Sequence, residues 1–418
     1  MNTNMKDSGI EWIGEIPSHW DIIPNKYIMH KFKEICLKYS NEDILSLSKK
    51  GVNIRDFSEG GKMPSTFDGY QKIYPGNLLL CLFDIDVTPR CVGIIKNEGL
   101  TSPAYSQFIL NDDADVLYFY YYYLMLDEDK TLVHLSKNLR HSLTEEQLGS
   151  LKVIKPPIQE QRNISNFLEK NIANIDDEIN KLLNLIEKYK EYKQSLITEI
   201  VTKGLNPEIP LKNSGAPWMP LIPNHWESVK FKFHLCANEN KGFPDLEVLS
   251  LYRDYGIIPK NSRNDNHNVT SEDTSNYKHV VKGNFVVNKM KAWQGSVAVS
   301  EYEGIISPAY YVYKFTSKDL NKKYFHYLIR NKSYTPEFRR LSTGIREGQW
   351  DLSRYSLENI LILIPPIDEQ KQIVNFLDEK CKLIDSFIIE KIHLIDKLEK
   401  YKKSLIFEYV TGKKEVQK

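Results

Sequence analysis

The chain has 418 residues, 41% of them hydrophobic and 27% charged, which is enough for two or three domains that each bury a core. Its 56 basic and 55 acidic residues give a net charge of +1, so overall charge does not indicate a nucleic-acid-binding protein, although it does not exclude a local basic face. Residues 1–7 are polar and no apolar stretch approaches ~20 residues, so we expect no signal peptide and no membrane span.

The cysteines indicate a cytoplasmic protein with reduced thiols. No pair has Cys-x-x-Cys spacing, and no His lies at a zinc-like distance from such a pair, so we expect no metal site. The five scattered cysteines are Cys36, Cys81, Cys91, Cys236 and Cys381.

Three short motifs of the first half of the chain return in the second half. They are Ile-Pro-x-His-Trp at 16–20 and 222–226, Ser-Pro-Ala-Tyr at 102–105 and 307–310, and Pro-Pro-Ile-x-Glu-Gln at 156–161 and 365–370. A repeat of this length is too long for a solenoid unit, and it can give two similar halves related by a pseudo-twofold axis. Such a molecule suits a partner with twofold character, and duplex DNA is the commonest.

The repeat predicts an α+β protein with two similar globular regions and a pair of long helices. We expect a globular region at 1–157, a long helix at 158–204, a linker at 205–218, a second globular region at 219–366 and a second long helix at 367–412. The linker carries Pro207, Pro210 and Pro217 and few apolar residues, which is typical of an extended connector.

Short apolar and β-branched runs between Gly, Asn and Pro predict strands in both globular regions. These strands are expected at 44–47, 77–80 and 92–95, and at 248–251, 284–287 and 297–299, with matching Gly-Asn turns at 76–77 and 283–284. The Tyr-rich run at 118–123 invites a base-stacking interpretation, but a buried helix against a sheet, like its counterpart at 324–329, explains it better.

The two long helices show the apolar spacing of a coiled-coil seam, with steps of four and three residues. The first seam consists of Ile164, Leu168, Ile172, Ile175, Ile179, Leu182, Ile186, Tyr189, Leu196 and Ile200, with Lys193 inside a seven-residue gap. The second consists of Ile373, Leu377, Cys381, Ile384, Ile388, Lys391, Ile395, Leu398, Leu405 and Tyr409. We expect antiparallel pairing within the chain; a parallel homodimeric coiled coil is the alternative.

We find no motif for catalysis: no phosphate-binding loop, no dinucleotide-binding turn, no Asn/Asp-Pro-Pro-Tyr/Phe sequence, no zinc-protease helix and no nucleophile elbow. His19 and His225 recur beside Trp20 and Trp226, but no acid or nucleophile recurs with them. We expect both histidines to be packed and hydrogen-bonded rather than catalytic.

The motifs at the ends of each half match, whereas the sequences between them diverge, as expected of a shared scaffold that carries two different recognition surfaces. Arg suits guanine and Asn or Gln suits adenine, while Lys mostly contacts phosphate. Candidate DNA-binding residues in the divergent loops are Lys49, Lys50, Arg55 and Arg90 in the first half, and Arg253, Arg263, Asn264, Asn266, Lys289, Lys291, Trp293 and Gln294 in the second. Each of them also has a plain interpretation as a solvated loop residue.

One further pair of arginines recurs at equivalent positions, Arg140 and Arg346. Directly after them the second copy carries three inserted residues, in a loop that contains Gln349. An Arg kept beside a loop of variable length fits a DNA-facing edge, and a structural salt bridge is the alternative.

In its layout the chain resembles the specificity subunit of type I restriction–modification systems over nearly its whole length. The residues that carry the resemblance are Asp-Ser-Gly at 7–9, Trp-Ile-Gly at 12–14 and the three repeated motifs with their long helices. The second copy departs locally, with Ala-Pro-Trp-Met-Pro at 216–220 in place of Glu-Trp-Ile-Gly-Glu at 11–15.

The resemblance implies a non-catalytic, sequence-specific DNA-binding subunit with two target recognition domains, each binding one half of a bipartite, gapped sequence in double-stranded DNA. The paired helices would fix the gap and dock two methylation subunits. Those partners would bind S-adenosylmethionine and methylate a flipped adenine, and two restriction subunits would add cleavage with ATP and magnesium. No cofactor, metal or membrane is implied for this chain itself.

Two other functions compete with this interpretation. A free-standing DNA methyltransferase or nuclease would need the cofactor or metal motifs that we do not find. A coiled-coil adaptor without a DNA role would lack a basic face shared by its two globular regions.

Overall fold

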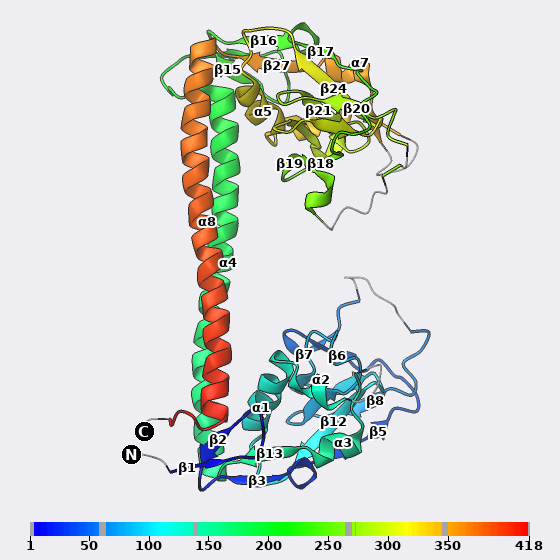
Figure 1. Ribbon diagram of the computed structural model, residues 1–418, viewed down its shortest axis with the longest axis vertical. Coiled ribbons are helices and arrows are strands. Elements are labelled where there is room, and N and C mark those ends of the chain that lie inside the picture. The colour runs from blue at the N-terminus through cyan, green and yellow to red at the C-terminus, as the bar shows by residue number, and fades with distance from the viewer. Residues whose placement is uncertain are drawn as a thin grey trace. The chain divides into compact units, whose positions relative to one another are not determined.

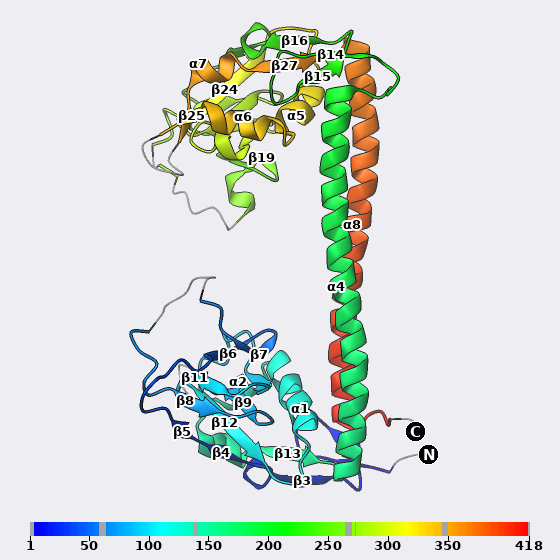
Figure 2. The same cartoon turned by 180° about the vertical axis from the view of Figure 1, so that it is seen from behind.

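The computed structural model describes residues 4–57, 64–136, 141–263, 270–271, 273–344 and 350–416 (Figure 1; Figure 2). It has the expected α+β composition, and it divides into two compact units that each contain a region of sheets and short helices together with parts of both long helices. Unit 1 comprises Met1–Leu182 and Ile392–Lys418, and unit 2 comprises Leu183–Lys391. The division falls inside both long helices, so the five-segment division expected from the sequence stays a prediction.

Unit 1 is built on a four-stranded antiparallel sheet with smaller strand pairs around it. The sheet order is β10 (Val92–Ile94), β9 (Leu78–Cys81), β12 (Tyr105–Leu110) and β4 (Met29–Phe32). The smaller groups are β11 (Gly99–Thr101), β8 (Gln71–Ile73) and β5 (Glu34–Ile35); the hairpin β6 (Leu45–Ser48) and β7 (Gly51–Ile54); β13 (Lys152–Lys155) with β3 (Asp21–Pro24); and β1 (Met5–Asp7) with β2 (Glu15–Pro17).

Unit 2 repeats this topology. Its main sheet has the order β22 (Val297–Val299), β21 (Phe285–Asn288), β24 (Tyr310–Phe315) and β17 (Leu235–Ala237). The smaller groups are β23 (Gly304–Ile306) with β20 (Lys278–Val280), the hairpin β18 (Leu249–Tyr252) and β19 (Gly256–Pro259), β27 (Leu361–Ile364) with β16 (Glu227–Lys230), β14 (Leu211–Asn213) with β15 (Leu221–Pro223), and β25 (Ser342–Thr343) with β26 (Asp351–Leu352). The internal sequence repeat is therefore a repeat of fold.

The strands lie where the apolar runs predicted them, within one residue at each start. Gly76 and Gly283, in the two predicted turns, both have φ of 89°, a left-handed conformation that favours glycine. The buried cores of the sheets explain the predicted pattern: Leu78, Leu79 and Phe285 are all fully buried.

Within the described residues, each unit has three short helices besides its parts of the long ones, and 3-10 turns interrupt the loops. The helices are α1 (Val116–Glu128), α2 (Thr131–Leu135) and α3 (Glu145–Ser150) in unit 1, and α5 (Lys322–Arg330), α6 (Tyr334–Leu341) and α7 (Arg354–Glu358) in unit 2. The 3-10 turns are η1 (Asn25–Tyr27), η2 (Phe231–Phe233), η3 (Lys260–Ser262) and η4 (Ala292–Gln294). Tyr118, Tyr122 and Tyr123 of α1 are at most 1% exposed, which confirms the buried helix and leaves these three rings unable to stack on bases.

The long helices are α4 (Ile158–Lys203) and α8 (Ile367–Val410), of 46 and 44 residues. In unit 1 the rings of Phe167 and Tyr409 lie 4.4 Å apart and Lys402 pairs with Asp176. Rising numbers on α4 thus meet falling numbers on α8, which confirms the antiparallel pairing.

The same pairing holds in unit 2, where it explains the gap in the first seam. The Nζ of Lys193 lies 2.6 Å from an Asp385 carboxylate oxygen, and the rings of Tyr189 and Phe387 stack at 5.9 Å. Lys402 and Asp176 of unit 1 stand at the same repeat offset, 402 − 193 and 385 − 176 both being 209. The two interhelical ion pairs are therefore copies of one contact.

The repeated Pro-Pro-Ile-x-Glu-Gln motif ties the start of each long helix to its unit. Gln161 is fully buried; its Nε2 donates to the Pro156 carbonyl at 2.7 Å, and its Oε1 accepts from the Asp115 backbone N–H at 2.8 Å. Gln370 makes the equivalent bonds to Pro365 and Asn321, both at 2.7 Å. Asp115 and Asn321 are the N-caps of α1 and α5, so each glutamine fixes where the buried helix begins.

The repeated histidines contact the glutamate of the same motif. His19 Nε2 lies 2.8 Å from Glu160 Oε1, and the indole N–H of Trp20 donates to the other oxygen at 2.8 Å. His225 Nε2 lies 2.7 Å from Glu369 Oε2 in unit 2. Both histidines are hydrogen-bonded as expected, but both are exposed rather than packed. The expectation that no acid recurs beside them was wrong, because Glu160 and Glu369 are 141 and 144 positions away in sequence and only the fold brings them together.

All five cysteines are free thiols. No helix within the described residues combines the length and the apolar character needed to span a membrane. In the same part of the chain, no group of three or more His, Cys, Asp or Glu side chains is placed to hold a metal ion.

Candidate nucleic-acid interface

In unit 2, the loop after strand β21, residues 289–296, carries four of the residues expected to bind DNA. Its 3-10 turn η4 is followed by Gly295, whose φ of 85° lets the chain reverse towards β22. The indole N–H of Trp293 donates to the Met290 carbonyl of the same loop at 3.1 Å, and the rings of Trp293 and Trp350 meet edge to face at 5.2 Å. The loop therefore holds Trp293 in one orientation with part of its surface exposed.

Two hollows flank Trp293 and Gln294. The first, of about 400 Å³, is lined by Arg253, Trp293, Gln294, Thr335, Pro336 and Arg339. The second, of about 440 Å³, is lined by residues that include Lys260, Asn288, Lys291, Trp293, Gln294 and Tyr310. The structure thus brings together Arg253, Lys291, Trp293 and Gln294, which the sequence nominated from two separate loops.

Arg263 and Lys289 are placed differently from these four. The guanidinium of Arg263 lies 4.4 Å from the Tyr255 ring centroid and 5.8 Å from that of Tyr252, which orients it by cation–π contact. Lys289 lies 3.3 Å from an Asp351 carboxylate oxygen, so part of its charge is already paired. Arg263 keeps a defined position beside the hairpin β18–β19, whereas Lys289 serves the fold of the loop as well.

Three residues of this surface were not nominated from the sequence. Arg339 of α6 lies over the Trp350 ring at 5.5 Å, and neither residue is close in sequence to the loop that they approach. Tyr310 lines the second hollow and opens strand β24. Tyr310 ends the repeated Ser-Pro-Ala-Tyr motif, so a signal for it was present, whereas no local pattern indicated Arg339.

In unit 1, Lys49 and Lys50 occupy the exposed turn of the hairpin β6–β7, and Arg55 follows that hairpin with its guanidinium 5.1 Å from the Phe57 ring centroid. The exposed ring of Phe83 lies 6.4 Å from that of Tyr105, the end of the first Ser-Pro-Ala-Tyr motif. Basic and aromatic groups therefore gather in unit 1 at the elements equivalent to those of the unit 2 surface.

Arg90 has a different environment from its predicted companions. Its Nη1 donates to the Tyr120 hydroxyl of α1 at 3.1 Å. It lines a hollow of about 410 Å³ together with Lys49 and with residues of α1, α4 and α8. Its side chain is thus turned towards the helices of its own unit.

The tyrosines that end the repeated motif remain protonated at neutral pH. Burial raises the pKa of Tyr105 and of Tyr310 above the usual phenol value. A protonated phenol can both donate and accept a hydrogen bond, which suits contact with base edges or phosphate.

Five nominated residues lie outside the described part of the chain: Arg140, Asn264, Asn266, Arg346 and Gln349.

Comparison with known proteins points to one family. The model of the family described as the type I restriction modification DNA specificity domain matches residues 91–188 and 223–400. The MjaVIII type I restriction enzyme specificity subunit of Methanocaldococcus jannaschii is 25% identical over 292 residues, covering 63% of this chain and 62% of the relative. The MjaX specificity subunit of the same organism is 25% identical over 284 residues, covering 65% and 61%. This chain thus matches just over three fifths of the length of either relative.

Solved structures share the fold at low sequence identity. A chain from the structural study of complex assembly and conformational transition of the type I restriction–modification system aligns with a TM-score of 0.69 at 13% identity, over 95% of this chain and 99% of that one. The crystal structure of the HsdS subunit from Thermoanaerobacter tengcongensis aligns with a TM-score of 0.52 at 13% identity, over 95% and 98%. Because the family model covers more than half of the residues and matches both units, the chain belongs to the type I restriction–modification DNA specificity family.

Proposed function

We propose that this chain is the sequence-specific DNA-binding subunit of a type I restriction–modification complex. Unit 1 binds one half of a bipartite, gapped target in double-stranded DNA, and unit 2 binds the other half. The chain itself carries out no catalysis; it directs adenine methylation and ATP-dependent cleavage by partner subunits.

One observation carries the proposal: the contacts that build the frame are duplicated, whereas the exposed loops on that frame are not. The glutamine anchors at Gln161 and Gln370 are the same contact in both units. The loops that follow the equivalent strands β9 and β21 instead differ, with an exposed Phe83 in the first and a partly exposed Trp293 in the second. A conserved frame with two different loops suits recognition of two different half-sites.

The side chains of the unit 2 surface have the chemistry for base and backbone contacts. Arg253 matches the paired acceptors of guanine, and Gln294 matches adenine. Trp293 offers an aromatic face for stacking or for a thymine methyl group, and Lys291 can pair with phosphate. The near-neutral net charge implies that binding depends on this local cluster and falls with added salt.

The partners follow from the family rather than from this chain alone. Two methylation subunits would supply S-adenosylmethionine binding, and two restriction subunits would supply ATP and magnesium chemistry. A straight α-helix of 46 residues is about 69 Å long, which is about two turns of DNA, so α4 and α8 have the length to set the gap between half-sites.

The test is adenine methylation mapping in cells that express the chain with its methylation subunit. Arg253→Ala and Gln294→Ala should each relax one half-site of a gapped motif, by roughly tenfold for a lost bidentate contact, and leave the other half-site unchanged. Lys282→Ala is the matched control, since Lys282 is exposed and pairs only with Glu301 among the described residues. An intact complex that methylates no gapped motif would overturn the proposal.

A further inference from the structure

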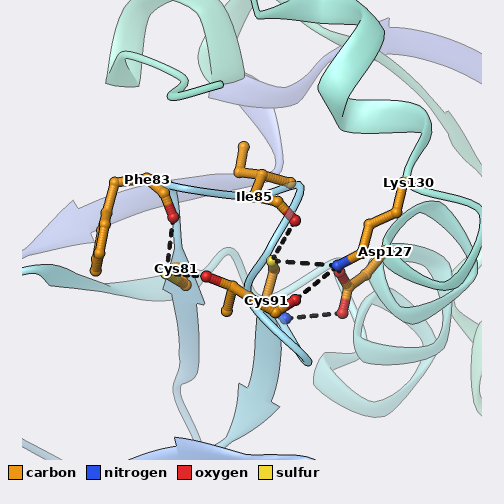
Figure 3. A network of polar contacts seen from close by, with 7 residues as sticks. Cys81, Phe83, Ile85, Cys91, Asp127 and Lys130 are labelled. Atoms are coloured by element: carbon orange, nitrogen blue, oxygen red, sulfur yellow. Dashed lines mark hydrogen bonds and ion pairs between the residues drawn. The ribbon is translucent and has the colours of Figure 1, made fainter. Parts of the chain in front are cut away.

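A buried carboxylate holds the loop between strands β9 and β10 of unit 1 (Figure 3). Asp127, near the end of α1, is 3% exposed. Its Oδ2 accepts from the backbone N–H of Cys91 at 2.7 Å, and its Oδ1 accepts from the ammonium of Lys130 at 2.8 Å. The same ammonium donates to the Thr88 carbonyl at 2.8 Å. Asp127 and Lys130 thus hold the loop 82–91 at two backbone groups, the N–H of Cys91 and the carbonyl of Thr88.

The sheet alone does not close this loop. The N–H of Cys81 donates to the Cys91 carbonyl at 2.8 Å, but the N–H of Cys91 points to Asp127 rather than across the ladder. Cys91 is 2% exposed, so that N–H would lack a partner without the carboxylate. Lys130 has a φ of 51°, an unfavourable backbone conformation for a side chain with a Cβ. The chain keeps this conformation at the residue whose ammonium reaches the loop.

In unit 2, a half-buried cation plays the corresponding part on the β18–β19 turn, residues 252–256. Arg330 is the last residue of α5. Its Nη1 donates to the Val297 carbonyl of β22 at 2.8 Å, and its Nη2 donates to the Arg253 carbonyl at 2.6 Å and, more weakly, to the Asp254 carbonyl at 3.5 Å. Among the residues that the structure describes, no carboxylate pairs with Arg330. Its guanidinium donates instead to backbone carbonyls, those of Arg253 and Asp254 in the turn and that of Val297 in β22.

The turn fits closely against this guanidinium. Gly256 closes the turn at φ of 74°, and a Cβ built on it would lie 3.8 Å from Nη1 of Arg330 and 3.6 Å from the Ala298 Cβ. The turn carries the Arg253 side chain towards Trp293 and Gln294, and the rings of Tyr252 and Tyr255 orient Arg263. Fixing the backbone of the turn therefore fixes two of the nominated DNA-binding arginines.

We propose that Asp127 and Lys130 in unit 1, and Arg330 in unit 2, are positioning residues. Each set determines the specificity of its unit's half-site by fixing the backbone of a recognition loop. The inference rests on the proposed function. None of the three residues contacts DNA in this proposal: the loop held in unit 1 carries the exposed ring of Phe83, and the turn held in unit 2 carries Arg253. The two units use different charged groups on different loops, so the sets are not copies: the position equivalent to Arg330 in unit 1, at the repeat offset of 206, is the buried Leu124.

The test compares Asp127→Asn and Arg330→Gln in the full chain assembled with its methylation subunit. Methylation rates are measured on DNA that matches both half-sites and on DNA with one mismatch in either half-site, after Arg253→Ala has assigned each half-site to a unit. Asp127→Asn should lower discrimination at the unit 1 half-site by roughly tenfold and leave the other unchanged, and Arg330→Gln should do the reverse. Each variant is the control of the other. Arg330→Lys should be intermediate, since an ammonium can reach some of the same carbonyls.

Equal loss of discrimination at both half-sites would overturn the inference, as would a lower melting temperature with both half-sites unchanged. If Asp127→Asn does not fold, Lys130→Met tests the same loop, because it keeps the acceptor of the Cys91 N–H on Asp127 and removes the ammonium with its contacts to Thr88 and Asp127. A wild-type chain that methylates no gapped motif overturns the proposed function as well. A wild-type motif that neither variant alters overturns only the positioning role.

Discussion

At the scale of single residues, the polar groups that matter most to the fold are buried and saturated with hydrogen bonds. Gln161 uses both amide hydrogens and its oxygen, on Pro156, Asp113 and the N-cap residue Asp115. The repeat separates it from the exposed Gln159, because Gln161 recurs as Gln370 whereas Gln159 does not recur, but its partners are set by the tertiary fold. Removing it leaves two carbonyls and one N–H without partners.

We expect Gln161→Leu to lower the free energy of unfolding of unit 1 by about 2–4 kcal/mol. Gln159→Leu, on the exposed face of the same helix, should change it by less than about 0.5 kcal/mol. The measurement is urea unfolding of the full chain followed by hydrogen exchange in α1, which reports unit 1 separately. Equal effects of the two substitutions would contradict the anchoring role.

A second single residue gives unit 2 its own dependence on pH. Burial, aided by the charge of Arg330, lowers the pKa of His326 from 6.5 to about 4, and its Nδ1 accepts from the Val299 backbone N–H at 3.2 Å. The unfolded chain therefore binds a proton that the folded chain excludes. Stability from this group is complete above pH 6.5 and is lost as the pH falls towards 4.

The loss over that range should be about 2–3 kcal/mol, and His326→Asn should remove it, since the amide oxygen can still accept from Val299. Thermal unfolding followed in unit 2 at several pH values between 4 and 8 measures the slope. The equivalent position of unit 1 is Tyr120, so unit 1 should lack this term. A slope unchanged by the substitution would contradict it.

At the scale of elements, the long helices were the part most readable from sequence, because the seam repeats within each helix. What the periodicity left unexplained was Lys193, which interrupts the apolar steps. Its partner Asp385 lies 192 positions away, and no local pattern links the two. The same limit applies to the candidate interface: composition nominated Trp293 and Gln294, but Arg339 arrives from a different helix.

The two interhelical ion pairs should specify the register of α4 and α8. Lys193→Asp should lower the free energy of unfolding by about 1 kcal/mol, because the pair is only partly buried, and adding Asp385→Lys should restore most of it. Lys190→Asp is the control, since Lys190 pairs only with the exposed Glu187 of its own helix among the described residues. If the double variant loses as much unfolding free energy as the two single variants together, the ion pair does not specify the register of the helices.

At the scale of the whole molecule, the contacts that stabilise the two units are duplicated, whereas the loops proposed to recognise DNA are not. The strand order, the glutamine anchors and the ion pairs recur in both units, whereas the loops and the residues that hold them do not. The repeat was visible in the sequence because the contacts of this duplicated frame are made by short motifs that occur in both halves. The recognition loops were visible mainly as the places where the repeat fails, and their conformations depend on residues from other elements.

If recognition is divided in this way, the two half-sites should be independent in energy. Arg55→Ala in unit 1 and Arg253→Ala in unit 2 each remove one nominated contact, at roughly tenfold in the rate of methylation of the matched target. Since the two residues belong to different units, the double variant should lose about the product, roughly a hundredfold, to within a factor of about two. Methylation kinetics on one gapped target with four proteins (wild type, the two single variants and the double variant) measure this. A double variant no worse than either single one would mean that both arginines serve one half-site, and that the duplicated frame does not divide the target.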